Sequence, residues 1–214
     1  MADRYGRAGG NWSAAGTWAA SSGGGSDGAG LNAGDAVILD ANSSGTFTID
    51  GAISIVTLVC TGFTGTLTHN GVTLTVSGNT FTLAAGMTYN ATTSSRIVAF
   101  TSTSGTTNIT TAGKSYGGVT LNGVGGAFSL VDAMTVITGG TLTLTNGTFN
   151  ANNQNVTTGL FSSSNSNTRV ITMGSGTWTL VSPSASPWDT TTSTGLTINP
   201  DTATIVVSAS ATGA

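Results

Sequence analysis

The chain has 214 residues and a formal net charge of −3 at pH 7, and only 6% of its residues are charged, against about 25% in an ordinary globular protein. Hydrophobic residues make up 38% of the sequence, which argues against a disordered chain. The five basic residues are scattered, which argues against a nucleic-acid partner, because phosphate binding needs clustered Lys or Arg. Thr, Ser, Gly and Asn replace the strong helix formers, so the composition predicts an all-β protein.

Residues 1–45 are predicted to form a loop-rich N-terminal module that contains two large aromatic residues, Trp12 and Trp18. No apolar segment follows Met1–Arg7, so we expect no signal peptide, and no run reaches the roughly 18 apolar residues of a membrane span. We therefore expect assembly in a cytoplasm and no membrane partner. The two tryptophans suit a cap that buries the end of a β stack, or a site for sugar stacking or subunit docking.

The segment Asp35–Asp40 predicts a short apolar strand with an Asp at each end. Asp commonly accepts hydrogen bonds from nearby backbone N–H groups at such positions, so we interpret Asp35 and Asp40 as turn caps. The rival interpretation is a Ca²⁺ site, since carboxylate oxygens suit that ion, but the sequence has no calcium-loop motif. We predict no metal and keep Asp35 and Asp40, with the two tryptophans, as candidates for a cap or docking surface.

Residues 46–214 are predicted to form one Thr/Gly-rich β repeat domain. Thr66–Gly71, Thr73–Gly78 and Thr80–Leu83 each begin with a Thr-apolar-Thr unit, and the units start seven residues apart. In such a unit the apolar residue points inward and both threonines point outward, and Gly or Asn accepts the corner that follows. Self-similarity of this kind predicts a β-solenoid with a coil of about 21 residues. A β-sandwich with hairpin connections is the alternative.

The alternation also predicts which side chains point inward, whereas residues 88–118 and 150–168 break the pattern and are interpreted as longer turns or edge segments. Thr204–Ser208 predicts a last strand without a polar cap after it. We therefore expect that end to be covered by another subunit or by further polypeptide. The predicted inward residues are Leu67, Leu74, Phe81, Phe100, Val119, Leu121, Phe128, Leu130, Val136, Leu142, Leu144, Phe149, Phe161, Ile171, Trp178, Leu196, Ile198, Ile205 and Val207.

The sequence contains no convincing set of catalytic residues, so we predict that the chain is not an enzyme and uses no cofactor. His69 is the only histidine, and because Asn70 and Gly71 follow it, we interpret it as a surface turn residue. Cys60 is the only cysteine and is interpreted as a buried hydrophobe. Residues 123–126, Gly-Val-Gly-Gly, lack a phosphate-binding Lys and are interpreted as a turn.

The segment Gly9–Trp12, the pair Thr17–Trp18, the run Ser22–Gly25 and the segment Asp35–Asn42 together resemble a recurrent module of phage-encoded proteins. That module has the pattern G-x-W…W…GG…D-x-V-x-x-D-A-N and precedes long Thr/Gly-rich repeats. Proteins of this kind are similar to phage tail-fibre, head-fibre and decoration components. Similar repeats also occur in bacterial surface proteins.

The resemblance implies a bacteriophage virion structural protein, such as a fibre, spike or capsid decoration subunit, located in the virion after assembly in the host cytoplasm. Its expected partners are other virion proteins and copies of itself, with a trimer as one arrangement. One alternative is a receptor-binding or polysaccharide-degrading tail protein that meets a host-surface glycan, with Asp189 or Asp35 as the carboxylate to examine. A bacterial surface adhesin is the third hypothesis, and it should carry an export signal.

Overall fold

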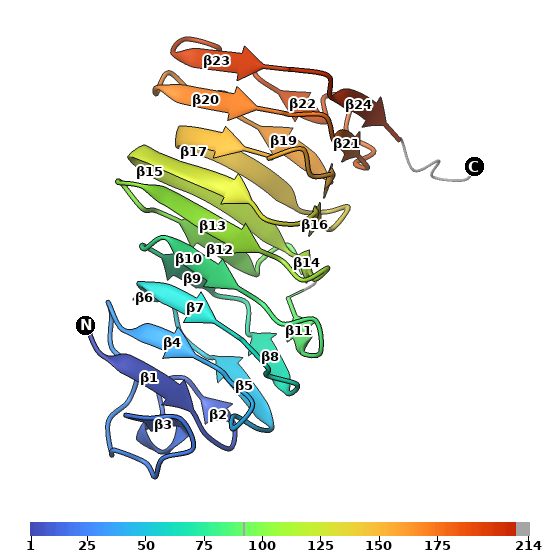
Figure 1. Ribbon diagram of the computed structural model, residues 1–214. Coiled ribbons are helices and arrows are strands. Elements are labelled where there is room, and N and C mark those ends of the chain that lie inside the picture. Colours follow the sequence, from blue (N-terminus) through green and yellow to red (C-terminus); the bar gives the residue numbers. More distant parts are fainter. Residues whose placement is uncertain (92, 209–214) are drawn as a thin grey trace.

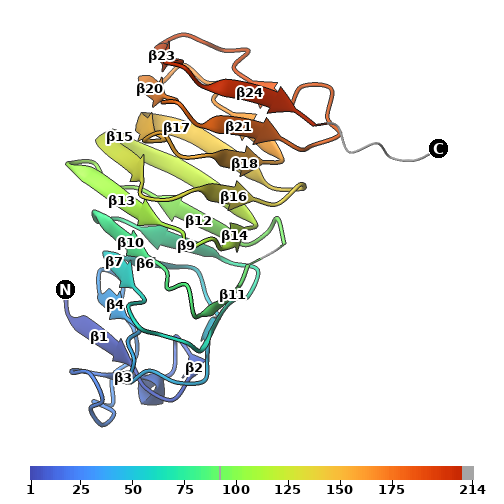
Figure 2. The ribbon, with the colours of Figure 1, turned by 45° about the vertical axis from the view of Figure 1, so that its right-hand side comes forward.

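The computed structural model describes residues 1–91 and 93–208. It is an all-β solenoid of about 7 turns (Figures 1 and 2). This result confirms the predicted fold and excludes the sandwich alternative. In the described residues the helical structure is the 3-10 turn Ala15–Thr17, and no helix there has the length and apolar character needed to cross a bilayer.

The strands stack on three faces of the solenoid, and all strand pairs in the described residues are parallel except the pair of β1 and β3. The first face contains β1 (Asp3–Gly6), β3 (Trp18–Ala19), β4 (Ala36–Ile38), β7 (Thr57–Val59), β10 (Thr80–Thr82), β13 (Thr106–Thr110), β20 (Arg169–Thr172), β23 (Leu196–Asn199) and the second halves of β15 (Gly118–Leu130) and β17 (Thr141–Asn150).

The second face consists of two sheets that follow one another along the solenoid, and the third face lies between the second and the first in chain order. The second face contains β2 (Gly10–Asn11), β5 (Thr46–Ile49), β8 (Thr66–His69) and β11 (Thr88–Asn90), followed by β14 (Ser115–Tyr116), β16 (Met134–Val136), β18 (Val156–Thr158), β21 (Thr177–Leu180) and β24 (Thr204–Val207). The third face contains β6 (Ile53–Ile55), β9 (Thr73–Val76), β12 (Ile97–Phe100), the first halves of β15 and β17, β19 (Leu160–Ser162) and β22 (Trp188–Asp189).

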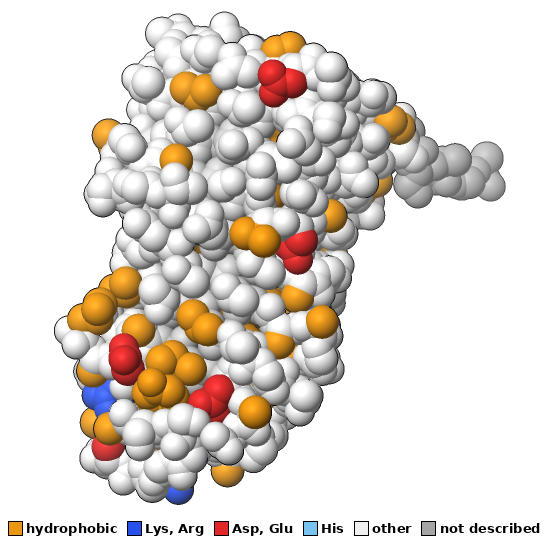
Figure 3. Space-filling model, viewed as in Figure 1, with side chains coloured by type: hydrophobic (Ala, Val, Ile, Leu, Met, Phe, Trp, Pro, Cys, Tyr) orange, Lys and Arg blue, Asp and Glu red, His pale blue; other side chains and the backbone are white. Residues whose placement is uncertain are grey.

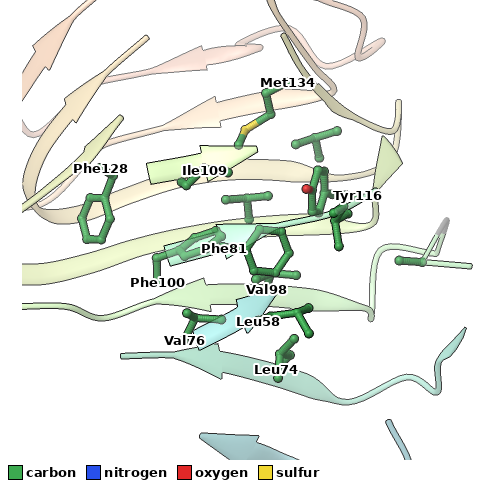
Figure 4. Close-up of a cluster of buried hydrophobic side chains, with 14 of the residues drawn as sticks. Leu58, Leu74, Val76, Phe81, Val98, Phe100, Ile109, Tyr116, Phe128 and Met134 are labelled. Carbon is green, nitrogen blue, oxygen red and sulfur yellow. The ribbon is translucent and has the colours of Figure 1, made fainter. Parts of the chain in front are cut away.

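Strand register stacks apolar side chains in columns inside the solenoid. On the first face Leu58 lies beside Val37, and Phe149 lies beside Phe128. The two partners are equally far apart in sequence in both pairs, and this separation matches the predicted coil length. Aromatic rings continue from one coil to the next, since the Phe81 and Phe100 ring centroids are 5.2 Å apart at an edge-on angle (Figure 4). Such pairs contribute about 1 kcal/mol each beyond the area that they bury.

Two coils are longer than the predicted length. Ile109 lies beside Phe81 and Ile198 lies beside Ile171, and in both pairs the partners are farther apart in sequence than Val37 and Leu58 are. The interpretation of residues 88–118 and 150–168 as turns or edge segments is wrong, because both ranges contain strands that belong to the stack. Their polar side chains extend the corners, while short apolar segments still reach the core.

Residues 123–126 are not a simple turn, which corrects the sequence interpretation. They lie inside the long strand β15, which crosses from the third face to the first with a register shift against β17. A Cβ atom at Gly123 would lie 1.9 Å from the carbonyl oxygen of Ser102 in the coil beneath. Glycine is therefore required there because the two backbones are in direct contact.

The predicted inward set is confirmed except at the C-terminal end. Most members are buried, and Leu196 is partly buried. Ile198, Ile205 and Val207 are 39%, 46% and 59% exposed. Their columns are inward, but no further coil covers them in the part of the chain that the structure describes.

The N-terminal end differs from the C-terminal end, because residues 12–34 fold across it. After β2 this segment takes the place that a third-face strand would occupy, and β3 pairs antiparallel with the outer edge of β1. Gly34 N–H also donates to the carbonyl of Ser54 in the third-face strand β6 at 2.8 Å. The first 45 residues are continuous with the stack, since β1 and β4 share the first-face sheet with β7.

Candidate functional site

Trp12 and Trp18 lie inside the N-terminal end of the solenoid and not on its surface. Their exposed fractions are 2% and 0%, and their ring centroids are 5.7 Å apart in an edge-on arrangement. The Trp18 Nε1–H donates to the carbonyl of Trp12 at 2.9 Å, and the Trp18 ring packs on Phe47. In this conformation neither ring offers a free face on which a sugar could stack.

Asp35 is a buried carboxylate that joins three segments of the N-terminal region. It accepts hydrogen bonds from the backbone N–H groups of Ala2 and Asn32, both at 3.0 Å, and pairs with Arg4 through Nε at 3.2 Å. Burial acts to raise the pKa of Asp35, but the bonds from Asn32, Ala2 and Arg4 outweigh it and lower the pKa. The carboxylate is therefore ionised at neutral pH and already engaged.

Asp40 caps the turn after β4. Its Oδ1 accepts the N–H of Asn42 at 2.9 Å, and its own N–H donates to the Ser43 hydroxyl at 3.0 Å. Ser43 in turn donates to the carbonyl of Gly6 in the neighbouring coil. Among the described residues no three His, Cys, Asp or Glu side chains are grouped to hold a metal ion, so the contacts around Asp35 and Asp40 are those of turn caps.

His69 is fully buried, so its interpretation as a surface turn residue is wrong. It lies beside Ile49 in an inward column of the second face, and its Nδ1 is 3.5 Å from the Tyr89 hydroxyl. Burial, and to a lesser extent the charge of Arg96, lower the pKa of His69 to about 4, although a backbone bond at Val72 acts in the opposite direction. His69 is therefore neutral at pH 7 and inaccessible to a substrate.

Cys60 is buried, as predicted. Burial raises the pKa of its thiol above the ordinary range. A buried thiol that stays protonated is a poor nucleophile and a poor metal ligand. Cys60 therefore serves as a packing residue in the core.

A shallow groove on the third face is the main surface feature that the sequence analysis missed. One depression is lined by residues that include Ser94, Ile97, Gly118 and Gly139, and a second by residues that include Leu160, Ser184 and Asp189; Thr141 and Thr143 line both. The two depressions therefore form one track that crosses β12, β15, β17, β19 and β22, with hydroxyl groups along its floor.

Asp189 is the charged side chain among the residues that line this groove. Hydrogen bonds from the backbone and side chain of Thr191 lower its pKa, and the Thr191 N–H lies 3.1 Å from Oδ1. An ionised carboxylate can accept a hydrogen bond from a ligand hydroxyl but cannot act as a general acid. Hydrolysis of a glycosidic bond normally needs a second carboxyl group, so this arrangement favours binding over cleavage.

Comparison with known proteins finds no matching family, no matching curated protein and no matching solved structure. The function is therefore argued from the residues and their geometry.

Arg169 is one of the scattered basic residues in the sequence, yet its side chain is fully buried in the fold. Its guanidinium donates to the Ser163 hydroxyl and carbonyl at 3.0 and 2.9 Å, and to the carbonyls of Asn167, Thr192 and Thr194 at 2.6, 3.1 and 3.1 Å. It thereby joins the corner at 163–168 to the corner at 190–195 in the next coil. The polar run Ser162–Asn167 before it is the one sequence signal that could have indicated such a site.

Proposed function

We propose that this chain is a non-catalytic structural subunit of a bacteriophage particle, such as a fibre, spike or decoration protein. The observation that carries the structural part of the proposal is a continuous solenoid with an outer surface of Thr, Ser and Asn and an open C-terminal end. The phage part rests on the resemblance of Gly9–Trp12 and Asp35–Asn42 to the N-terminal module of such proteins.

The surface of the molecule supports a role in assembly. Figure 3 shows isolated acidic and basic side chains on a mainly uncharged face, and the chain has only five basic and eight acidic residues. Little charge repulsion therefore opposes contact with other subunits. Short hydroxyl and amide side chains keep such a surface hydrated while leaving it flat enough to pack.

Immunogold electron microscopy on purified particles tests this proposal. An antibody raised against the purified chain should label intact virions, and the label should disappear when the antibody is first absorbed with that chain. Label on the head would indicate decoration, and label on the tail would indicate a fibre or spike. Particles that carry no label, while the protein is abundant in the same lysate outside them, would contradict the proposal.

The third-face groove favours a second candidate function, which is recognition of a host-surface glycan. Its second depression has a volume of about 360 Å³, at the low end for ligand sites, and combines hydroxyl groups, the Leu160 side chain and the Asp189 carboxylate. Titration with host polysaccharide should give binding that Asp189→Asn weakens, without release of reducing sugar. Release of sugar that stops in Asp189→Asn would instead credit the groove with catalysis.

A further inference from the structure

The C-terminal end of the solenoid presents all three faces without a further coil. Its last strands are β22, β23 and β24, and each pairs on one side only in the described residues. Ile198, Ile205 and Val207 lie above Ile171, Trp178 and Leu180, which are 0% exposed. The exposed apolar side chains are thus the continuation of the core columns, and burying them requires another layer of strands.

The backbone of β24 points half of its polar groups at this open end. Thr204 and Ser208 donate their N–H groups to Gly176 and Leu180 in the coil beneath. Alternate residues of a parallel strand bond to opposite neighbours, so the N–H groups of Ile205 and Val207 point away from β21. Apolar columns and free strand edges coincide here, and exposed edges of this kind promote pairing with another strand.

The other end of the same molecule cannot supply that layer. At the N-terminal end β3 covers the edge of β1, and residues 12–34 cross the third-face position. The aromatic residues there, Trp12 and Trp18, are already buried by their own chain. Head-to-tail stacking would therefore set a covered surface against an open one.

We infer that the C-terminal end of one chain binds the C-terminal end of a second copy, around a two-fold axis perpendicular to the solenoid. In the described residues this is the end that offers both free edges and uncovered apolar columns, so it is the surface that best complements itself. The inference rests on the proposed role as an assembly subunit, but it does not depend on that assembly being a virion.

The two-fold arrangement has definite geometry. Rotation by a half turn reverses the direction in which the coils progress, so strands of the two copies meet antiparallel, which is a sound pairing for strand edges. The Asp189 and Asp201 carboxylates near this end accept backbone N–H groups of their own chain. A trimer of solenoids packed side by side would leave the apolar ends uncovered, so the two arrangements make different predictions.

Sedimentation equilibrium and small-angle X-ray scattering on the full chain test the inference. We expect a mass twice that of the single chain at micromolar concentration, and a longest dimension about twice that of the monomer. A monomer throughout this range would overturn the inference and leave the end to a different occupant. Masses that keep rising with concentration, or an oligomer no longer than the monomer, would overturn it as well.

Two substitutions at Val207 locate the interface. Val207→Pro removes an N–H group that points at the open end, and proline is tolerated in an edge strand where its N–H faces outward. Val207→Lys places a charge in the apolar contact. We expect either change to weaken dimerisation by about tenfold or more, with an unchanged unfolding temperature of the monomer.

The matched control is Val124→Lys, because Val124 is 70% exposed in the corner between two faces, away from both ends. This control should dimerise like the unmodified chain. Equal dimerisation in all three variants would overturn the inference. Because these measurements use the purified chain, a failed particle-labelling experiment leaves them valid, and a monomeric chain leaves the labelling result valid.

Discussion

Arg169 illustrates how one residue can hold two coils together where the local strand pairing is weak. The guanidinium replaces water for several backbone carbonyls in two successive corners, and it does so with no carboxylate among its hydrogen-bond partners in the described residues. Burial lowers its pKa, but the group stays charged at any pH at which the protein folds. A charged donor in this position is therefore a structural element of the C-terminal coils.

Arg169→Met should lower the free energy of unfolding by at least about 2 kcal/mol, because it leaves buried carbonyl groups without donors. Urea denaturation followed by tryptophan fluorescence measures this loss. Lys114→Met is the control, since the ammonium group of Lys114 makes one exposed contact to the Ala85 carbonyl and should change stability by less than about 0.5 kcal/mol. Equal effects of the two substitutions would contradict the role assigned to Arg169.

His69 makes stability depend on pH in a defined window. Its pKa is about 4 in the folded chain and 6.5 for the free imidazole, so the unfolded chain takes up a proton first as the pH falls. The contribution of the neutral imidazole is complete above pH 6.5 and is lost progressively down to pH 4, by about 3 kcal/mol in total. Urea denaturation at successive pH values measures this slope.

His69→Leu should flatten the dependence between pH 6.5 and 4, because leucine suits an inward column and does not titrate. Both proteins should still lose stability below pH 4, where the carboxylates with lowered pKa values, Asp35 among them, become protonated. A variant that retains the same slope above pH 4 would show that another group is responsible.

At the scale of the element, corners limit the fold more strictly than strands do. The corner between the two halves of β15 needs glycine at 123 and 126, since a Cβ atom at either would lie 1.9 or 2.0 Å from the Ser102 oxygen. Strand positions are more permissive, because many apolar residues fit an inward column. Stability should therefore depend sharply on a few small residues that carry no function.

Gly123→Ala should destabilise the protein by about 2 kcal/mol or more, because the backbone of one of the two coils has to move. Gly139→Ala is the matched control in the next coil, where an added Cβ would meet nothing within 4 Å. The control should be neutral or slightly stabilising, since alanine restricts the unfolded chain. Thermal unfolding of both variants checks the difference, and equal melting temperatures would refute the close-contact argument.

The sequence predicted those elements that depend on local alternation and missed those that depend on register. Thr-apolar-Thr units were sufficient for the strands and for most of the inward set. The same alternation also places His69 inward, two residues after Leu67, although the Asn-Gly pair behind it favours a surface turn. The groove could not be predicted, because bringing Thr143 and Asp189 onto one face depends on the summed lengths of corners that vary between coils.

At the scale of the whole molecule, the near absence of charge determines how the protein responds to salt. In the described residues the ion pairs both involve Arg4, with Asp27 and Asp35 as partners. The rest of the fold is held by apolar columns and backbone ladders, which salt does not screen. Electrostatics therefore contributes to one end of the solenoid and little elsewhere.

The melting temperature should consequently change little between low and moderate sodium chloride concentration, because screening acts on exposed charges. Arg4→Met should lower stability at every salt concentration by a similar amount, since its partner Asp35 is buried. Differential scanning calorimetry across a salt series measures both effects. A steep rise or fall in the melting temperature of the unmodified chain would mean that long-range charge interactions matter more than this structure indicates.

The stacking of successive coils on common faces gives the molecule a length that changes only in whole steps. Each complete coil adds one strand spacing of about 4.8 Å along the axis, whereas extra residues at a corner add none, as the longer coils before Ile109 and Ile198 demonstrate. Duplicating one coil in the gene would therefore lengthen the rod by a fixed increment and leave both ends unchanged. Insertions at the corners would alter only its girth, so length and surface decoration can evolve separately.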